Sequence, residues 1–173
     1  MSNYLDYNAS TPIDPRVLNV MIDAFKNKYG NADSRTHAFG ESARRIVEES
    51  RGNIAELLDI NKDEVFFTSG ATESDNISIL GLQEYAEKFS KKHIITTAIE
   101  HKAVLEPLSV LESKGFEVTY IKPDINGRIN PDEVLSNVRN DTLLVSVMHT
   151  NNETGVIQPI DIIGEALDKT DVF

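Results

Sequence analysis

Apolar residues recur along the chain at two spacings, and each spacing predicts one kind of element. Repeats of three and four residues, typical of amphipathic helices, predict helices over residues 15–29, 39–58, 72–89, 101–114, 131–138 and 160–167. Short continuous apolar runs predict buried strands over residues 64–68, 93–97, 117–121 and 142–147. From residue 64 onward strands and helices alternate, so we expect an α/β fold, a three-layer sandwich in which helices cover both faces of a mostly parallel sheet.

The last three residues, Asp171 to Phe173, follow the final helical pattern and have the character of a strand that is beginning. A parallel sheet that stopped there would leave an unpaired edge and exposed apolar surface, which natural proteins avoid. We therefore expect that the chain is a fragment or that another chain completes the sheet.

Composition and charge narrow the class of protein. The chain has 173 residues, and 17 basic residues against 28 acidic ones give a formal net charge of −11. This acidic balance argues against a nucleic-acid partner, because phosphates would be repelled. The N-terminus lacks the basic and apolar regions of a signal peptide, and no apolar run approaches the roughly 20 residues that cross a bilayer. We expect a cytoplasmic protein that does not contact membranes.

The chain contains no cysteine. This absence excludes a disulfide framework, a thiolate metal site and a thiol nucleophile from these 173 residues. We expect no metal site in the chain.

The first polar segment that could carry chemistry follows the apolar run at 64–68. Ser69, Gly70, Ala71 and Thr72 stand where a helix is expected to begin. Small residues let the main chain approach a ligand closely, and the N–H groups of a first helical turn attract anions such as phosphate. The alternative is that Ser69 or Thr72 only caps the helix.

The second segment, Glu100-His101-Lys102, follows the run at 93–97 and also stands at an expected helix start. At the positive end of a helix an imidazole favours its neutral form, and a neutral ring can stack on an aromatic cofactor or relay a proton. The alternative is an ordinary histidine at a helix start. Lys102 is read as a solvent-exposed lysine.

The third segment, residues 148–155, follows the most apolar run and contains Asn151, Asn152 and Gly155. Side-chain amides can donate to a ligand oxygen, and a glycine allows a sharp turn. The alternative is ordinary turn chemistry. Because ligands of parallel sheets bind at the carboxyl ends of strands, the shared position of the three segments predicts one site for an aromatic ligand that carries a phosphate.

Six stretches resemble one family of enzymes. YLDYNASTP, GNADSRTHAFG, FFTSGATESDN, TTAIEHKAVLEP, GFEVTYI and LLVSVMHTNNETGVIQPI are similar to the N-terminal part of cysteine desulfurases, which are class V, fold-type I enzymes that depend on pyridoxal 5'-phosphate (PLP). The resemblance covers essentially the whole chain. Selenocysteine lyases and some class V aminotransferases share parts of the pattern.

The resemblance implies a role for individual residues. Ala71 and Thr72 would hold the cofactor phosphate, His101 would stack on the cofactor ring and act as the catalytic residue in proton transfers, and Asn152 would bind the phenolate oxygen of the ring. Asn8 and Ala9 would lie near the substrate. Three further residues match a loop of the family: Asn31, Ser34 and His37.

The resemblance also implies what these residues do not contain. Family members are more than twice as long, and their pyridinium-binding aspartate, Schiff-base lysine, nucleophilic cysteine and substrate-binding arginine come later in the sequence. Residues 1–14 would belong to or pack on the small domain, and residues 15–173 would form the N-terminal part of the PLP-binding large domain, with the rest of both domains absent. We expect the chain to be inactive by itself.

Two hypotheses about function follow. The first is the N-terminal part of a PLP-dependent enzyme that converts L-cysteine to L-alanine and passes sulfur, as an enzyme persulfide, toward iron-sulfur clusters or tRNA thiolation. The resemblance then implies a homodimer or a complementing C-terminal chain, and a sulfur-acceptor protein such as an iron-sulfur scaffold. The second hypothesis is a non-catalytic, desulfurase-like scaffold protein, or a related aminotransferase or selenocysteine lyase.

Overall fold

The chain divides between Phe67 and Thr68 into two units in the computed structural model, which describes residues 3–173. The first unit contains helices α1 (Pro15–Asn27) and α2 (Ala38–Leu58) and the short 3-10 helix η1 (Lys62–Glu64). Each unit is described separately below.

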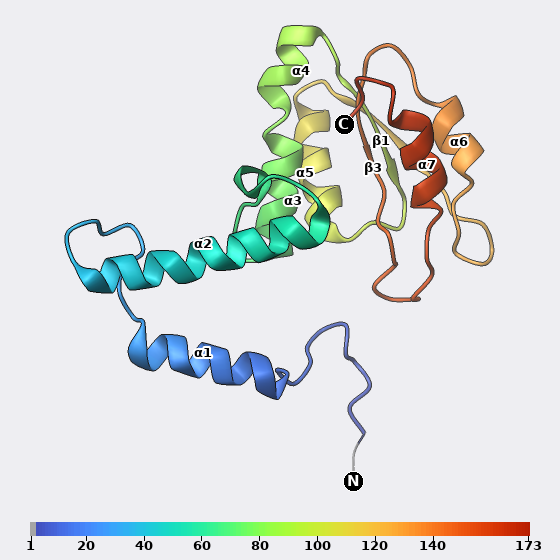
Figure 1. Ribbon diagram of the computed structural model, residues 1–173. Helices are drawn as coiled ribbons and strands as arrows, with labels where there is room; N and C mark the ends of the chain where they lie inside the picture. The colour runs from blue at the N-terminus through green and yellow to red at the C-terminus, as the bar shows by residue number, and fades with distance from the viewer. Residues whose placement is uncertain (1–2) are drawn as a thin grey trace. The chain divides into compact units, whose positions relative to one another are not determined.

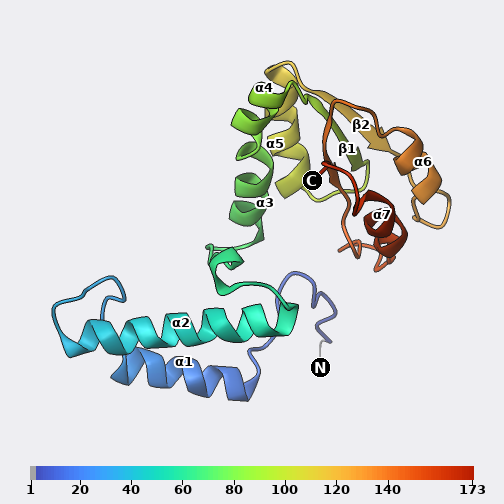
Figure 2. The same ribbon diagram turned by 45° about the horizontal axis from the view of Figure 1, so that its top comes forward.

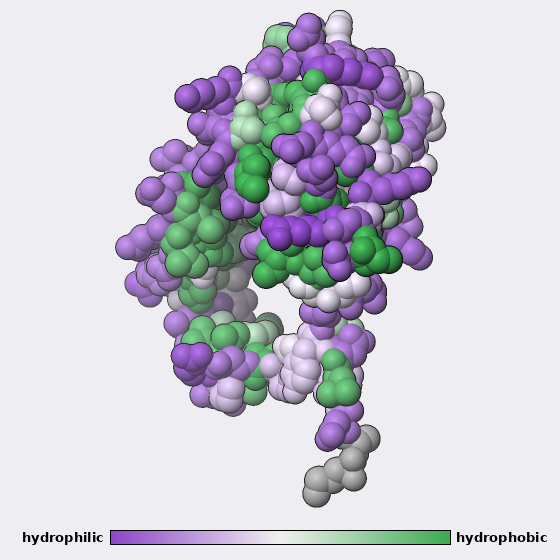
Figure 3. Space-filling model, turned by 90° about the vertical axis from the view of Figure 1, so that its right-hand side faces the viewer, coloured by the Kyte–Doolittle hydropathy of each residue, from purple (hydrophilic) through white to green (hydrophobic). Residues whose placement is uncertain are grey.

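The two long helices of the first unit begin at the residues that their caps require. The Asp14 side chain accepts a hydrogen bond from the Arg16 main chain, and Pro15 occupies the first helical position of α1. The His37 side chain caps α2 by accepting from the Gly40 main chain at 3.1 Å. The apolar residues that recur along α1 at helical spacing are exposed: Val17, Leu18, Met21, Ile22 and Phe25. Apolar side chains therefore lie on the surface, as Figure 3 illustrates.

The second unit is a three-layer α/β structure with a parallel sheet at its centre. Its three strands are β1 (His93–Thr97), β2 (Glu117–Ile121) and β3 (Thr142–Ser146). The strand order is β2-β1-β3, and both pairings are parallel. Two groups of helices enclose the sheet (Figures 1 and 2): α3 (Ala71–Leu80), α4 (Gln83–Phe89) and α5 (Lys102–Ser113) on one face, and α6 (Pro131–Ser136) and α7 (Ile160–Leu167) on the other.

Alternate residues of the central strand face the two helical layers. Ile94 belongs to a buried cluster with Leu108 of α5 and Leu143 of β3, and Ile95 belongs to a second cluster with Val134 of α6 and Ile163 of α7. Successive strand residues point to opposite faces, so one run of apolar residues supplies both cores. The fold class expected from the sequence is confirmed, and the strands at 93–97 and 117–121 lie where they were predicted. The strand predicted over residues 142–147 ends one residue earlier, at Ser146.

The strand predicted over residues 64–68 is wrong. Glu64 belongs to η1, and residues 65–68 are irregular, with Phe66 81% and Phe67 50% exposed. A strand needs a neighbouring strand to receive its hydrogen bonds, and none of the strand pairings among residues 3–173 includes residues 64–68. Within the described residues the apolar run 64–68 has no such neighbour.

The helix predicted over residues 72–89 is two helices, α3 and α4, separated at Gly81 and Leu82. Gly81 approaches the preceding turn so closely that an added Cβ would lie 2.4 Å from the Ile77 carbonyl oxygen. Phe173 runs beside β3: its N–H donates to the Leu143 carbonyl at 3.0 Å, and its carbonyl accepts from the Val145 N–H at 2.9 Å. This is a parallel ladder pattern, as expected for the end of the chain.

No helix among residues 3–173 combines the length and the apolar character needed to span a membrane.

Candidate functional site

The loops after β1 and β3 lie at one edge of the sheet and carry two of the predicted site segments. β1 and β3 are hydrogen-bonded neighbours with the same direction, so their carboxyl ends meet at this edge. His101 follows β1, and Asn152 follows β3. The remaining segment, at the start of α3, belongs to the same unit, and α3 packs along α5. It follows irregular residues 65–68 and not a strand, so the shared position after strand ends that the sequence predicts holds for two of the three segments.

The start of α3 presents main-chain donors rather than a side-chain cap. Gly70 is the N-cap residue, and no side chain caps this helix, so the alternative interpretation that Ser69 or Thr72 serves as the cap is wrong. The Ser69 N–H donates to the Glu73 carboxylate at 2.6 Å, and this bond lowers the pKa of Glu73. The first helical N–H groups, which begin at Ala71 and Thr72, have no partner within a helix and attract anions.

His101 is the N-cap residue of α5, and its ring is tied to the main chain through one nitrogen. Its Nδ1 accepts from the Ala103 N–H at 3.1 Å, which assigns the proton of the neutral ring to Nε2. The side chain is exposed. Nδ1 therefore acts as a helix cap, as the alternative of an ordinary histidine at a helix start predicts. Nε2 carries the ring proton and can donate it to a ligand.

Asn152 lies in a tight turn on the exposed side of its loop. Its Nδ2 donates to the Glu153 carboxylate at 3.1 Å. The turn closes at Gly155, whose φ of 73° lies in the left-handed region that favours glycine. Thr150 and Ile157 form an antiparallel bridge, so the loop is a small closed hairpin. The segment is therefore a turn, as the alternative predicts, and the side-chain amide of Asn152 is also exposed on its surface.

The structure gives defined contacts to two further polar residues: Glu100, to which sequence reasoning assigned no role, and Asn151, which it counted only among the possible amide donors of its segment. Glu100 is 8% exposed, and its Oε1 accepts from the Met148 N–H at 2.7 Å. Asn151 is 7% exposed, and its Nδ2 donates to the Ile99 carbonyl at 3.1 Å. Each residue directly precedes a predicted site residue, which is the one sequence signal that pointed to them.

The predicted site residues of the first unit have their own local structure. Asn8 and Ala9 lie in an exposed turn, where the Ala9 N–H donates to the Asp6 carbonyl at 3.2 Å. In the loop before α2, the Ser34 hydroxyl and the His37 Nε2 are 3.0 Å apart. The Asn31 side chain accepts in the same loop from the Asp33 N–H at 3.0 Å, so this loop is held by its own polar groups.

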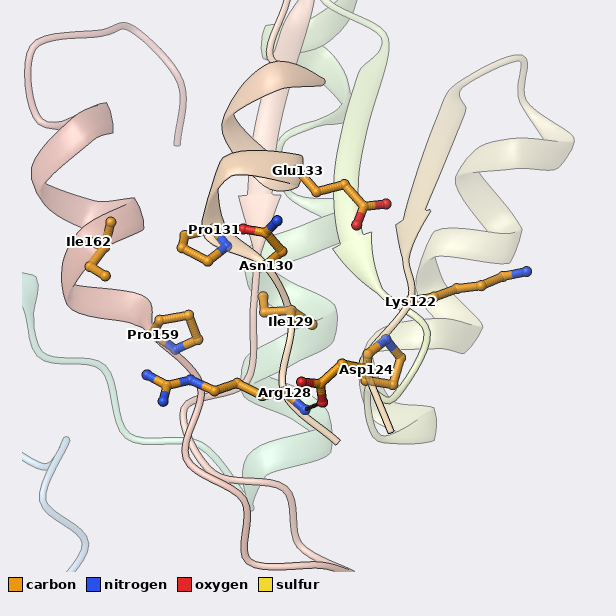
Figure 4. A pocket seen from close by; sticks show the side chains of 10 residues that line it. Lys122, Asp124, Arg128, Ile129, Asn130, Pro131, Glu133, Pro159 and Ile162 are labelled. Atoms are coloured by element: carbon orange, nitrogen blue, oxygen red, sulfur yellow. Dashed lines mark hydrogen bonds between the residues drawn. The ribbon is translucent and has the colours of Figure 1, made fainter. Parts of the chain in front are cut away.

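A cavity of about 520 Å³ lies elsewhere in the second unit and contains none of the predicted site residues. Lys122, Asp124, Arg128, Glu133 and others surround it (Figure 4). The Asp124 carboxylate is occupied by main-chain donors, including the Arg128 N–H at 3.0 Å, and this bond lowers the pKa of Asp124. Among the described residues no group of three or more His, Cys, Asp or Glu side chains is placed to hold a metal ion.

Comparison with protein families gives one match. The aminotransferase class V model matches residues 3–173. The chain is 49% identical over 161 residues to the cysteine desulfurase IscS of Anaeromyxobacter sp. (strain K), covering 93% of this chain and 40% of that protein. It is 45% identical over 170 residues to the mitochondrial cysteine desulfurase of Candida maltosa, covering 98% of this chain and 35% of that protein.

Solved structures show the same likeness. The crystal structure of DndA from Streptomyces lividans is 48% identical with a TM-score of 0.88, covering 99% of this chain and 48% of that chain. A structure described as SspA in complex with cysteine is 38% identical with a TM-score of 0.91, covering 99% of this chain and 49% of that one. The chain therefore spans about 40% of the length of the curated relatives and about half of the structural neighbours.

Proposed function

Because the chain belongs to the aminotransferase class V family, as its resemblance implied, we propose that it supplies part of the cofactor site of a PLP-dependent cysteine desulfurase. The observation that carries this proposal is the joining of the loops after β1 and β3 at one edge of the sheet, which supports a single site that includes His101 and Asn152. Relatives named cysteine desulfurases, 45–49% identical, support the reaction class.

The residues present suit the cofactor. The start of α3 has no side-chain cap, and its first turn offers main-chain donors for a phosphate at Ala71 and Thr72, the latter with a hydroxyl beside them. We assign His101 to the face of the cofactor ring, where its Nε2 holds a proton, and Asn152 to the phenolate oxygen. When bound, PLP supplies an electron sink that stabilises negative charge at the carbon next to the amino group.

The proposal also covers the residues near the substrate, the domain to which residues 1–14 belong, and the partners of the protein. Asn8 and Ala9 would lie near L-cysteine, and residues 1–14 would belong to or pack on the small domain. Asn31, Ser34 and His37 would form a loop near the site. The protein would act in the cytoplasm as a homodimer or with a complementing C-terminal chain, and would pass sulfur to an acceptor such as an iron-sulfur scaffold. With no cysteine in its sequence, the chain cannot itself carry a persulfide.

Nuclear magnetic resonance tests the cofactor proposal. The ¹⁵N-labelled protein is titrated with PLP and, separately, with inorganic phosphate. We expect the amide signals of Ala71 and Thr72 to move with both compounds, and those of His101 and Asn152 to move with PLP only. Asn152→Ala should weaken PLP binding and leave phosphate binding unchanged. If millimolar PLP moves none of these four signals, the non-catalytic scaffold becomes the better account.

A further inference from the structure

Beyond the ends of β1 and β3, two side chains hydrogen-bond the loops that follow these strands to each other. The last register pair of these strands is Thr96 with Ser146, and the Thr96 hydroxyl donates to the Ser146 carbonyl at 3.0 Å. After this pair the loops leave the ladder, so main-chain hydrogen bonds of the sheet no longer fix their separation. Among residues 3–173, the hydrogen bonds that join the two loops beyond that point come from the side chains of Glu100 and Asn151.

These contacts are reciprocal. Glu100, in the loop after β1, accepts from the main-chain N–H of Met148 in the other loop at 2.7 Å. Asn151, in the loop after β3, donates to the main-chain carbonyl of Ile99 in the first loop at 3.1 Å. Each loop thus holds the main chain of the other, and we call this pair of contacts the cross-loop clamp.

The Glu100 carboxyl is buried and also accepts a hydrogen bond from Thr97 at the end of β1. It is 8% exposed, and the Thr97 hydroxyl donates to the same Oε1 at 3.0 Å. Burial raises the pKa of Glu100, the donors from Met148 and Thr97 act against this rise, and the charge of Asp75 in α3 adds to it. Burial of a carboxyl costs free energy unless the group is hydrogen-bonded, so the two donors at Oε1 favour this one placement of the Glu100 carboxyl.

Asn151 is held as firmly from its own side. Its Oδ1 accepts from three donors, the N–H groups of Glu153 and Thr154 and the Thr154 hydroxyl, at 3.0, 2.9 and 3.1 Å. Three donors at the oxygen determine which end of the amide is the NH₂ group, and this group points to Ile99. The Gly155 N–H also donates to the Asn151 carbonyl at 2.8 Å.

The residue after each clamp residue is exposed and carries the expected chemistry, His101 after Glu100 and Asn152 after Asn151. Building on the function proposed above, we infer that Glu100 and Asn151 are positioning residues that fix the spacing of His101 and Asn152 across the cofactor. Neither clamp residue touches the reacting atoms. They act by fixing the main-chain conformation at His101 and Asn152, which determines where these two side chains point.

Ring signals of the histidines test the clamp directly, since the chain has only 4 His. In protein with ¹³C-labelled histidine, Glu100→Ala should shift or broaden the ring signals of His101. His93, buried at the other end of β1, should keep its signal and so report that the fold is intact. Glu100→Gln keeps an acceptor oxygen and should restore the native His101 signal.

A second pair of variants separates the cross-loop bond from the turn. Asn151→Asp keeps an oxygen for the three turn donors but loses the NH₂ donor to Ile99, whereas Asn151→Ala loses both. Thr142→Val is the matched control, because it removes two side-chain hydrogen bonds at the start of β3, with the His93 ring and the Arg139 N–H, and changes neither loop. Since this variant alters a partner of His93, the His93 signal reports on the fold only in the Glu100 and Asn151 variants. We expect both Asn151 variants, and not Thr142→Val, to alter the His101 signal.

Binding of PLP then gives the functional readout. Glu100→Ala and Asn151→Asp should each raise the Kd for PLP about tenfold, while Glu100→Gln and Thr142→Val stay within about twofold. An unchanged His101 signal in Glu100→Ala, or an unchanged Kd in a protein that binds PLP, overturns the positioning role. If the unaltered protein binds no PLP, the cofactor proposal fails, and the His101 signal alone decides whether the clamp positions this ring.

Discussion

His93 and Thr142 meet at the amino ends of β1 and β3, where the His93 Nδ1 and the Thr142 hydroxyl oxygen are 2.8 Å apart. The other ring nitrogen, Nε2, is 2.9 Å from the Thr119 hydroxyl oxygen of β2. A single imidazole, 1% exposed, therefore joins all three strands. A neutral ring is suited to this position, because it can donate at one nitrogen and accept at the other.

Acid should weaken the fold through His93. The pKa of His93 lies below its usual 6.5, chiefly because of burial, with the Arg139 charge adding to the effect and Glu117 and Asp141 opposing it. As the pH falls below about 6.5, the unfolded chain binds a proton that the folded chain resists, so the free energy of unfolding decreases. Urea unfolding at about pH 7.5 and about pH 5.5 measures this loss.

The matched variants for this prediction are His93→Gln and His149→Gln. His93→Gln should flatten the pH dependence, whereas His149→Gln, at an exposed side chain, should leave it unchanged. Glu100 changes the free energy of unfolding in the opposite direction. Because burial raises its pKa above the usual 4.5, the folded chain binds a proton at a pH at which the unfolded chain does not, so acid stabilises the fold through this residue. A pH dependence that is equally steep with and without His93 would contradict the assignment.

The layer formed by α5 should contribute strongly to stability. Leu108 is fully buried in the cluster that includes Ile94 and Leu143, and Val110 on the same helix is 44% exposed. Leu108→Ala removes buried methyl groups and leaves a cavity, so we expect a loss of about 2–5 kcal/mol. Val110→Ala should lose less than about 1 kcal/mol in the same urea titration. Similar losses in the two variants would show that this core is wrongly placed.

Two glycines should respond in opposite directions to the same substitution. Gly155 has a φ of 73°, so Gly155→Ala forces a side chain into the left-handed region and should destabilise the protein by about 1 kcal/mol. Gly164 lies inside α7, and nothing lies within 4 Å of an added Cβ there. Gly164→Ala should therefore stabilise the protein by about 0.5–1 kcal/mol. Thermal unfolding of both variants measures the signs.

Borohydride reduction should find no lysine that captures PLP at a single site. Lys91, a largely buried lysine, pairs with the Asp171 carboxylate at 2.8 Å, and Lys102 is exposed as the first residue of α5. We expect low labelling spread over several exposed lysines, measured by peptide mass spectrometry. Lys102→Arg should leave the total unchanged. One stoichiometric adduct at Lys102 would give this lysine a catalytic role.

Helix starts could be predicted from sequence because their signals are local. Asp14 with Pro15 marks the start of α1, and the Asn130 side chain caps α6 just before Pro131, by accepting from the Asp132 N–H at 3.0 Å. Each signal needs only neighbours in the chain. The carboxyl-end position of His101 and Asn152 followed from the same alternation of elements.

What could not be predicted depends on residues far apart in the chain. The run at 64–68 has strand-like composition, but composition does not say whether a neighbouring strand exists, and here Phe66 is exposed. Glu100 and Met148 are joined across 48 positions, so no local pattern announces their hydrogen bond. The break between α3 and α4 at Gly81 is local, but a single glycine inside a helical pattern is not by itself a stop signal.

Ile94 and Ile95 pack into different cores, and this restricts where residues can be inserted into or deleted from the sequence. Because neighbours in β1 serve opposite cores, one residue inserted into or deleted from the strand would turn each apolar side chain toward the wrong layer. The same event at the exposed residues 124–126, in the turn between β2 and α6, would leave both cores in place. Over evolutionary time, length variation should therefore accumulate in such turns and be absent from residues 93–97.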